Sequence, residues 1–239
     1  GPTTFFSSTL KALTPNALGT TGAGTTVSNG TLELAGGVSL AAEPLTLGGT
    51  LSSQTGTNTY TADISLLPGA VIDVGPASLL IESGKTLAGG NGFVKAGNGT
   101  LRLTGDPNQT GPFYVSAGTV ELQHSGSTDA SFIIAPGATL RENTAGDLGD
   151  NYSITNNGTL DLRASETIGV LAGSGLVTIG ANLAYTLTVA NDSRSGTFAG
   201  VIENGLGTLS LSKNGTGVQI LSGANTYTGP TVLNANSGT

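Results

Sequence analysis

Residues 99–103, Gly-Thr-Leu-Arg-Leu, recur at residues 118–122 as Gly-Thr-Val-Glu-Leu. In both copies apolar residues flank a charged one, which is the alternation of a short β-strand with one buried and one solvated face. The glycine that opens each copy permits the positive φ of a tight corner. The phrase therefore predicts a corner followed by a strand of about five residues.

The same phrase occurs along the whole chain. Asn-Gly pairs stand at several of its starts, and these pairs are typical of corners. Further copies and looser versions are Gly30-Thr31-Leu32-Glu33-Leu34, Gly49-Thr50-Leu51, Ala70-Val71-Ile72-Asp73-Val74, Ala138-Thr139-Leu140, Gly158-Thr159-Leu160-Asp161-Leu162 and Gly207-Thr208-Leu209-Ser210-Leu211.

The spacing of the phrase indicates the fold class. Many starts are separated by roughly 15 to 21 residues, the length of one coil of a β-helix with two or three short strands. A sandwich of antiparallel hairpins would have strands at roughly 8 to 12 residues and no reason to repeat one phrase. We therefore predict an all-β, single-stranded parallel β-helix (β-solenoid) with coils of roughly 20 residues. Inward Leu, Val and Ile should stack between coils, and asparagines at corners should form side-chain ladders.

Two longer segments match each other without gaps, residues 95–117 and residues 213–235. Lys95 aligns with Lys213, and Leu103 with Leu221. Residues 56–61 echo residues 223–228 in part. What repeats is glycine corners, an inward leucine and a Gly-Pro turn, so the similarity lies in positions that form structure.

At this point the chain resembles a known family. The wording Lys-x-Gly-x-Gly followed by Leu-x-Gly-x-Asn-x-Tyr-Thr-Gly at residues 213–229, with Phe-Ala-Gly-Val-Ile at residues 198–202, is similar to the autotransporter-associated β-strand repeat, or passenger-associated transport repeat. The likeness extends from about residue 16 to the end. Residues 106–109 and Gln219 depart from the pattern and put local packing in doubt. The resemblance implies a right-handed parallel β-helix in the extracellular, surface-exposed passenger of a secreted or cell-surface bacterial protein, where such repeats are linked to export and form a stalk.

Composition excludes several kinds of partner. The formal net charge is −7 and only eight residues are Lys or Arg, so we expect no nucleic-acid binding. No apolar run approaches the roughly 18 residues that span a bilayer, so we expect no membrane contact by this segment. Cysteine is absent, which removes disulfides and thiolate chemistry.

The domain organisation is expected to be simple. Residues 1–2 resemble the scar of a removed tag, and residues 3–20 are interpreted as an N-terminal cap, helical or irregular, or as a frayed segment of a preceding domain. The cap interpretation rests on the near-helical spacing of Phe5, Phe6, Leu10, Leu13 and Leu18. Residues 21–239 are predicted to be β-helix repeats and a fragment of a longer array.

Candidate chemical groups have a simpler structural explanation in each case. His124, the only histidine, is interpreted as a solvated turn residue. The loop 141–151 offers oxygen ligands for calcium but lacks known calcium motifs, so a turn with solvated acids is the interpretation. A solvated outer face likewise accounts for the other charges that a polysaccharide-active groove would need, namely Glu121, Asp129, Glu142, Asp147, Asp150, Asp161, Arg102, Arg141 and Arg163. We predict no catalytic residue, no metal and no cofactor.

The leading functional hypothesis is a non-enzymatic passenger segment that acts as a stalk and offers an adhesive surface. One alternative is a β-helix that binds or cleaves polysaccharides, and another is a self-associating biofilm adhesin. The expected partners are a host or neighbouring-cell surface, glycans, or further copies of the chain.

Overall fold

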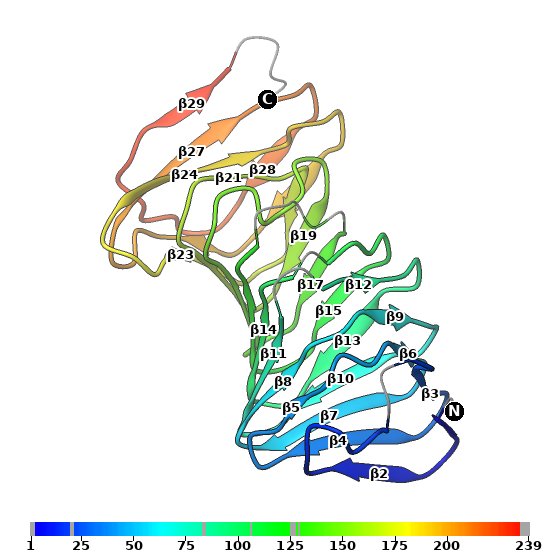
Figure 1. The fold of residues 1–239 in the computed structure, drawn as a ribbon. Helices are drawn as coiled ribbons and strands as arrows, with labels where there is room; N and C mark the ends of the chain where they lie inside the picture. Colours follow the sequence, from blue (N-terminus) through cyan, green and yellow to red (C-terminus); the bar gives the residue numbers. More distant parts are fainter. Residues whose placement is uncertain are drawn as a thin grey trace. The chain divides into compact units, whose positions relative to one another are not determined.

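The computed structural model of the protein describes residues 3–19, 22–82, 85–105, 107–124, 128 and 130–234 (Figure 1). The expected tag scar at residues 1–2 lies outside the described residues. Within them every strand pairing is parallel and no helix occurs, so the predicted parallel β-solenoid with coils of about 20 residues is confirmed. The chain divides into two compact units, Gly1–His124 and Ser125–Thr239.

The first unit has three rows of parallel strands, and successive coils each place one strand in a row. The first row is β1 (Thr3–Phe5), β3 (Thr25–Val27), β6 (Leu45–Leu47), β9 (Ile64–Leu66) and β12 (Leu87–Ala88). The second row is β2 (Thr9–Ala12), β4 (Thr31–Ala35), β7 (Thr50–Thr55), β10 (Val71–Val74), β13 (Phe93–Ala96) and β15 (Phe113–Val115). The third row is β5 (Ser39–Leu40), β8 (Thr57–Tyr60), β11 (Ser78–Ile81), β14 (Thr100–Leu103) and β16 (Thr119–Leu122).

The second unit follows the same plan with four rows of strands. Two rows are β17 (Phe132–Ile134), β19 (Ser153–Asn156) and β22 (Val170–Ala172), and β18 (Thr139–Glu142), β20 (Thr159–Leu162), β23 (Leu176–Ile179) and β26 (Val201–Ile202). The other two are β21 (Glu166–Thr167), β24 (Ala184–Val189), β27 (Thr208–Lys213) and β29 (Thr231–Leu233), and β25 (Gly196–Phe198) with β28 (Gln219–Leu221).

The core follows from the register of the repeated phrase. In β14 and β16, Leu101 lies beside Val120 and Leu103 beside Leu122, and all four side chains are buried. Because side chains alternate along a strand, the residue between them faces outward in every coil. The predicted stacking of inward aliphatic side chains is confirmed.

The first described residues form strands, not a helix. Strand β1 pairs with β3 and β2 pairs with β4, with Leu10 beside Leu32. A neighbouring coil offers an unpaired row of backbone groups, and this overrides the near-helical spacing of the apolar residues. Ala12 of β2 is buried, whereas Phe6, in the bend between β1 and β2, is exposed.

Asparagines stack at one corner of the second unit. Asn214 donates a hydrogen bond from its side-chain amide to Asn191 at 3.2 Å, and Asn234 donates in the same way to Asn214. Stacked amides add hydrogen bonds along the direction in which coils accumulate. The expected asparagine ladder is therefore present.

The two aligned lysines share two contacts, one set in each unit. Lys95 Nζ donates to the carbonyl oxygens of Ala96 and Gly97, and Lys213 Nζ donates to those of Asn214 and Gly215. Both lysines are buried and bind the corner that directly follows them in the sequence. The repeated lysine therefore stabilises the corner that follows it by hydrogen bonds to the backbone carbonyl groups.

The departures from the repeat have two different outcomes. Gln219 extends its amide to Leu171, donating to the carbonyl oxygen at 2.8 Å and accepting from the backbone N–H at 3.3 Å. Gln109 is fully buried, and neither its amide nitrogen nor its amide oxygen has a hydrogen-bond partner. One substitution is therefore compensated by backbone contacts and the other is not.

Replacing Gln109 with leucine is expected to raise the free energy of unfolding by about 1 kcal/mol, because a buried amide without partners carries an uncompensated desolvation cost. Gln219→Leu is the matched control and is expected to lower stability, because it removes two bonds to Leu171. Urea denaturation of both variants measures the effect. Equal destabilisation by both changes would contradict this account of Gln109.

Candidate functional site

The outer face of the third row in the first unit carries aligned side chains of two kinds. Thr57, Ser78, Thr100 and Thr119 are register partners in β8, β11, β14 and β16. Two residues further along the strands, a second line of register partners consists of Thr59, Leu80, Arg102 and Glu121. The repeated Gly-Thr start produces the line of hydroxyls, because identical phrases in parallel register place identical residues side by side.

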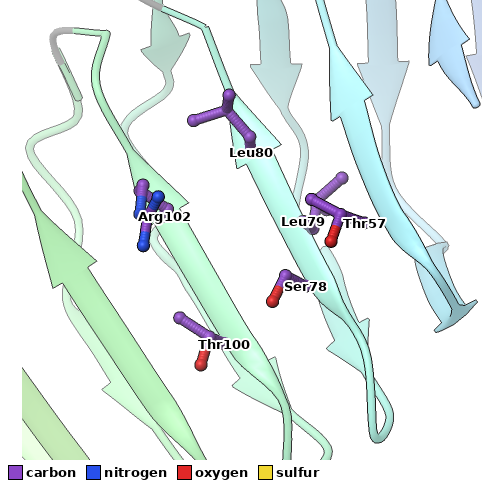
Figure 2. A pocket seen from close by; sticks show the side chains of 6 residues that line it. All are labelled: Thr57, Ser78, Leu79, Leu80, Thr100 and Arg102. Atoms are coloured by element: carbon purple, nitrogen blue, oxygen red, sulfur yellow. The ribbon is translucent and has the colours of Figure 1, made fainter. Parts of the chain in front are cut away.

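A shallow hollow of about 200 Å³ lies on this face (Figure 2). Figure 2 shows Ser78 and Leu80 on one strand and Thr100 and Arg102 on its neighbour, with Thr57 and Leu79 completing the lining. Arg102 Nε donates to Glu121 Oε2 at 2.8 Å, and the arginine side chain is half exposed. The hollow is smaller than the roughly 300 to 1,000 Å³ usual for small-molecule pockets, so it suits a surface contact better than an enclosed ligand.

His124 is 6% exposed, so its interpretation as a solvated turn residue is wrong. The alternation that turns Val120 and Leu122 inward continues beyond the end of β16 and turns residue 124 the same way. The residues that follow it, 125–127, lie outside the described part of the chain.

The charged residues singled out from the sequence do not converge in one groove. Arg102 pairs with Glu121 in the first unit, whereas Asp161 in the second unit accepts from Arg141 Nε at 2.7 Å and lies 3.6 Å from Arg163 Nε. Asp150 is exposed, and Asp129 lies outside the described residues. The outer-face interpretation therefore holds for Arg102 and Glu121, which pair across adjacent coils. It is wrong for Asp161, which is 6% exposed and lies beneath the two arginines.

Glu142 and Asp147 are not solvated, which corrects the interpretation of loop 141–151. Both are fully buried, and Glu166, which the sequence analysis did not single out, is 3% exposed. The sequence held a signal for this, because Leu140-Arg141-Glu142 places a glutamate where the phrase elsewhere has its second inward leucine. Because side chains alternate along a strand, this position faces the interior of the coil whichever residue occupies it.

Backbone N–H groups bind each of the three buried carboxylates. Glu142 Oε2 accepts from the N–H groups of Arg163 and Ala164 at 3.1 and 3.2 Å. Glu166 Oε1 accepts from Gly146 and Asp147 at 2.6 and 3.1 Å. Asp147 Oδ2 accepts from Asn143 and Thr144 at 3.3 and 2.9 Å, closing its own turn.

Burial dominates the electrostatics of the glutamates. Desolvation raises the pKa of Glu142 to about 7 and the pKa of Glu166 to about 9, with a further rise from the neighbouring carboxylates. Among the described residues, no group of three His, Cys, Asp or Glu side chains has an arrangement that could hold a metal ion. Nor does this part of the chain contain a helix long and apolar enough to cross a membrane.

Comparison with known proteins adds an independent observation. A family model described as "Passenger-associated-transport-repeat" matches residues 93–122 and 211–235, which include the two aligned lysines. Over 178 residues the chain is 33% identical to the "Adhesin BmaC autotransporter" of Brucella suis biovar 1 (strain 1330). That alignment covers 70% of this chain and 4% of the relative, so the chain spans a small part of the relative's length. No solved structure matches.

Proposed function

From the premise that this chain is a passenger-associated-transport-repeat region of an autotransporter passenger, exposed at the cell surface, we propose that it is a non-enzymatic spacer that also offers an adhesive face. The observation that carries the proposal is the interior of the coils. In both units most of the buried side chains are stacked aliphatic ones, as expected of a segment whose task is to hold its own structure.

The outer surface supports a binding role better than a catalytic one. Arg102 and Glu121 pair with each other, and the arginines of the second unit pair with Asp161. A glycoside-cleaving groove requires two carboxyl groups on opposite sides of the bond to be cut, one of them as a proton donor. The carboxyl groups with a raised pKa, Glu142 and Glu166, are inside the solenoid and out of reach of a polymer.

The test compares adhesion with cleavage for the same preparation. Beads that display the chain are incubated with epithelial cells and with immobilised glycans, and beads that display an unrelated β-solenoid serve as the control. The purified chain is screened in parallel for release of reducing ends from polysaccharides. We expect retention of the beads without glycan cleavage; cleavage by the purified chain would overturn the proposal, as would retention no better than that of the control.

A sugar-binding surface is the second candidate, and the hollow in the first unit favours it. Aligned hydroxyls and the exposed edge of a guanidinium are groups that hydrogen-bond sugar hydroxyls and carboxylates. Arg102→Ala is expected to reduce retention on glycans at least about fivefold, since a hydrogen bond to a charged group contributes about 1 kcal/mol or more. Arg194→Ala, at an exposed ion pair with Asp192 in the second unit, is the matched control and should leave retention unchanged.

Self-association is the third candidate. Ile220, Val232 and Leu233, in β28 and β29, expose large apolar surfaces that a second copy could cover. Light scattering over a range of concentrations tests this, and a strict monomer at high concentration would exclude it.

A further inference from the structure

The buried glutamates of the second unit lie in two successive coils. Glu142 ends β18, whose register partner is β20, and Glu166 begins β21 after the next corner. Glu142 reaches the backbone of the later coil at residues 163–164, and Glu166 reaches back to the earlier coil at residues 146–147. Each glutamate side chain therefore links its own coil to the adjacent one through hydrogen bonds to backbone N–H groups.

One oxygen of each carboxyl group is left over by these contacts. Glu142 Oε1 and Glu166 Oε2 are buried and have no hydrogen-bond partner when both groups are ionised. The two carboxyl groups also act on each other electrostatically, since each contributes to the shift in the pKa of the other. Two carboxylates can only accept, so they can bond to each other only if one of them carries a proton.

The charges around the pair make the doubly ionised state costly. Asp147 lies in the turn that Glu166 binds, and its negative charge acts on both glutamates. Arg163 offers its backbone N–H to Glu142, while its side chain lies near Asp161. Arg141, the neighbour of Glu142 in β18, donates to Asp161 as well. Leu187 of β24 is the apolar register partner of Glu166.

We propose that Glu142 and Glu166 share one proton, and that this carboxyl pair is a pH-dependent fastener between two coils of the second unit. With the proton present, Glu142 Oε1 and Glu166 Oε2 satisfy each other and the four backbone N–H bonds are kept. Loss of the proton leaves two buried negative charges facing each other beside Asp147. Repulsion between the two charges then destabilises the stacking of the two coils.

The direction of the pH dependence follows from linkage. Both folded-state pKa values, about 7 and about 9, exceed the ordinary glutamate value of 4.5, so the unfolded chain releases these protons at lower pH than the folded chain. Between about pH 4.5 and about pH 9 the folded state therefore holds more protons, and its stability falls as the pH rises. The folded pair holds two protons below about pH 7, the single shared proton between about pH 7 and about pH 9, and none above that. Its contribution to stability is full below pH 4.5 and lost through pH 7 to 9.

The test measures the melting temperature of the whole chain from about pH 5 to about pH 9 for the wild type and for Glu166→Gln. The amide oxygen of the variant can still accept from Gly146 and Asp147, and its nitrogen can donate to Glu142 Oε1 without a titratable proton. We expect the wild type to lose about 5 °C or more across this range and the variant to lose much less. Glu82→Gln, at an exposed glutamate, should retain the wild-type slope.

Two further measurements keep the proposal testable if the variant does not fold. Carboxyl ¹³C titration of the glutamate-labelled wild type should show two glutamates that titrate between about pH 7 and about pH 9; ordinary titration of every glutamate would overturn the proposal. Melting at about pH 9 is repeated with Ca²⁺. If Ca²⁺ stabilises the wild type and not Glu166→Gln, the free oxygens hold a cation and the shared proton is refuted. Parallel slopes for the wild type and Glu166→Gln would refute it as well.

Discussion

Replacement of Lys95 by methionine is expected to lower the free energy of unfolding by about 3 kcal/mol. Lys95 is fully buried, and its Nζ donates to the carbonyl oxygens of Ala96 at 2.9 Å, Gly97 at 2.7 Å and Ala117 at 2.9 Å. The third of these lies in the next coil, so one ammonium group binds two corners. Methionine keeps most of the volume of the stem but removes the donors, which leaves three carbonyl groups without this partner.

The expected loss is smaller than three charge-assisted hydrogen bonds could supply. Burial lowers the pKa of Lys95 to about 8, partly offset by the charge of Asp73, which shows that desolvation cancels part of the gain. Equilibrium denaturation in guanidinium chloride at neutral pH measures the change. Lys11→Met is the control, because Lys11 is half exposed in an ion pair with Glu33 and should contribute about 0.5 kcal/mol. Wild-type stability of the Lys95 variant would show that water can replace the ammonium group.

Substitution of Gly99 by alanine is expected to cost about 3 kcal/mol or more, because the added methyl group collides with backbone and has no room to relax. A Cβ at this position would overlap the carbonyl oxygens of Gly75 and Ala77, which belong to the preceding coil. Successive coils are held about 4.8 Å apart by their backbone hydrogen bonds, so they cannot separate locally without breaking the ladder. Thermal melting and denaturant titration both report the loss.

Two glycine controls separate the collision from other effects of the substitution. Gly22→Ala meets no atom within 4 Å and should change stability little. Gly137→Ala also meets no atom but has a φ of 81°, so it isolates the strain of a left-handed residue, about 1 kcal/mol. If Gly99→Ala is no worse than Gly137→Ala, the close approach of the coils at this corner does not limit the choice of residue.

Much of the fold could be predicted because the solenoid is specified locally. Each five-residue phrase contains a glycine corner and an alternating strand. Repetition of the phrase at near-constant spacing favours the stacking of identical strands in parallel coils. The prediction failed at polar residues that the fold buries. His124, Glu142, Asp147 and Asp161 were judged by their polarity and placed in water. Strand alternation turns His124 and Glu142 inward, whereas Asp147 is buried by the turn that it closes. The apolar spacing near the N-terminus suggested a helix, but the next coil offers backbone groups for strand pairing, and this pairing is not visible in the local sequence.

The sequence by itself determined the parallel coils, the stacked aliphatic core, the asparagine corners and the family. These features depend on which residue types recur at near-constant spacing, and that spacing is visible in the sequence itself. Only the tertiary structure decided which groups from different coils meet, such as Lys95 with the carbonyl of Ala117, or Glu142 with the backbone of Arg163 and Ala164. Contacts of that kind depend on the length and course of each irregular corner, which set how one coil lies on the next, and no short motif specifies them.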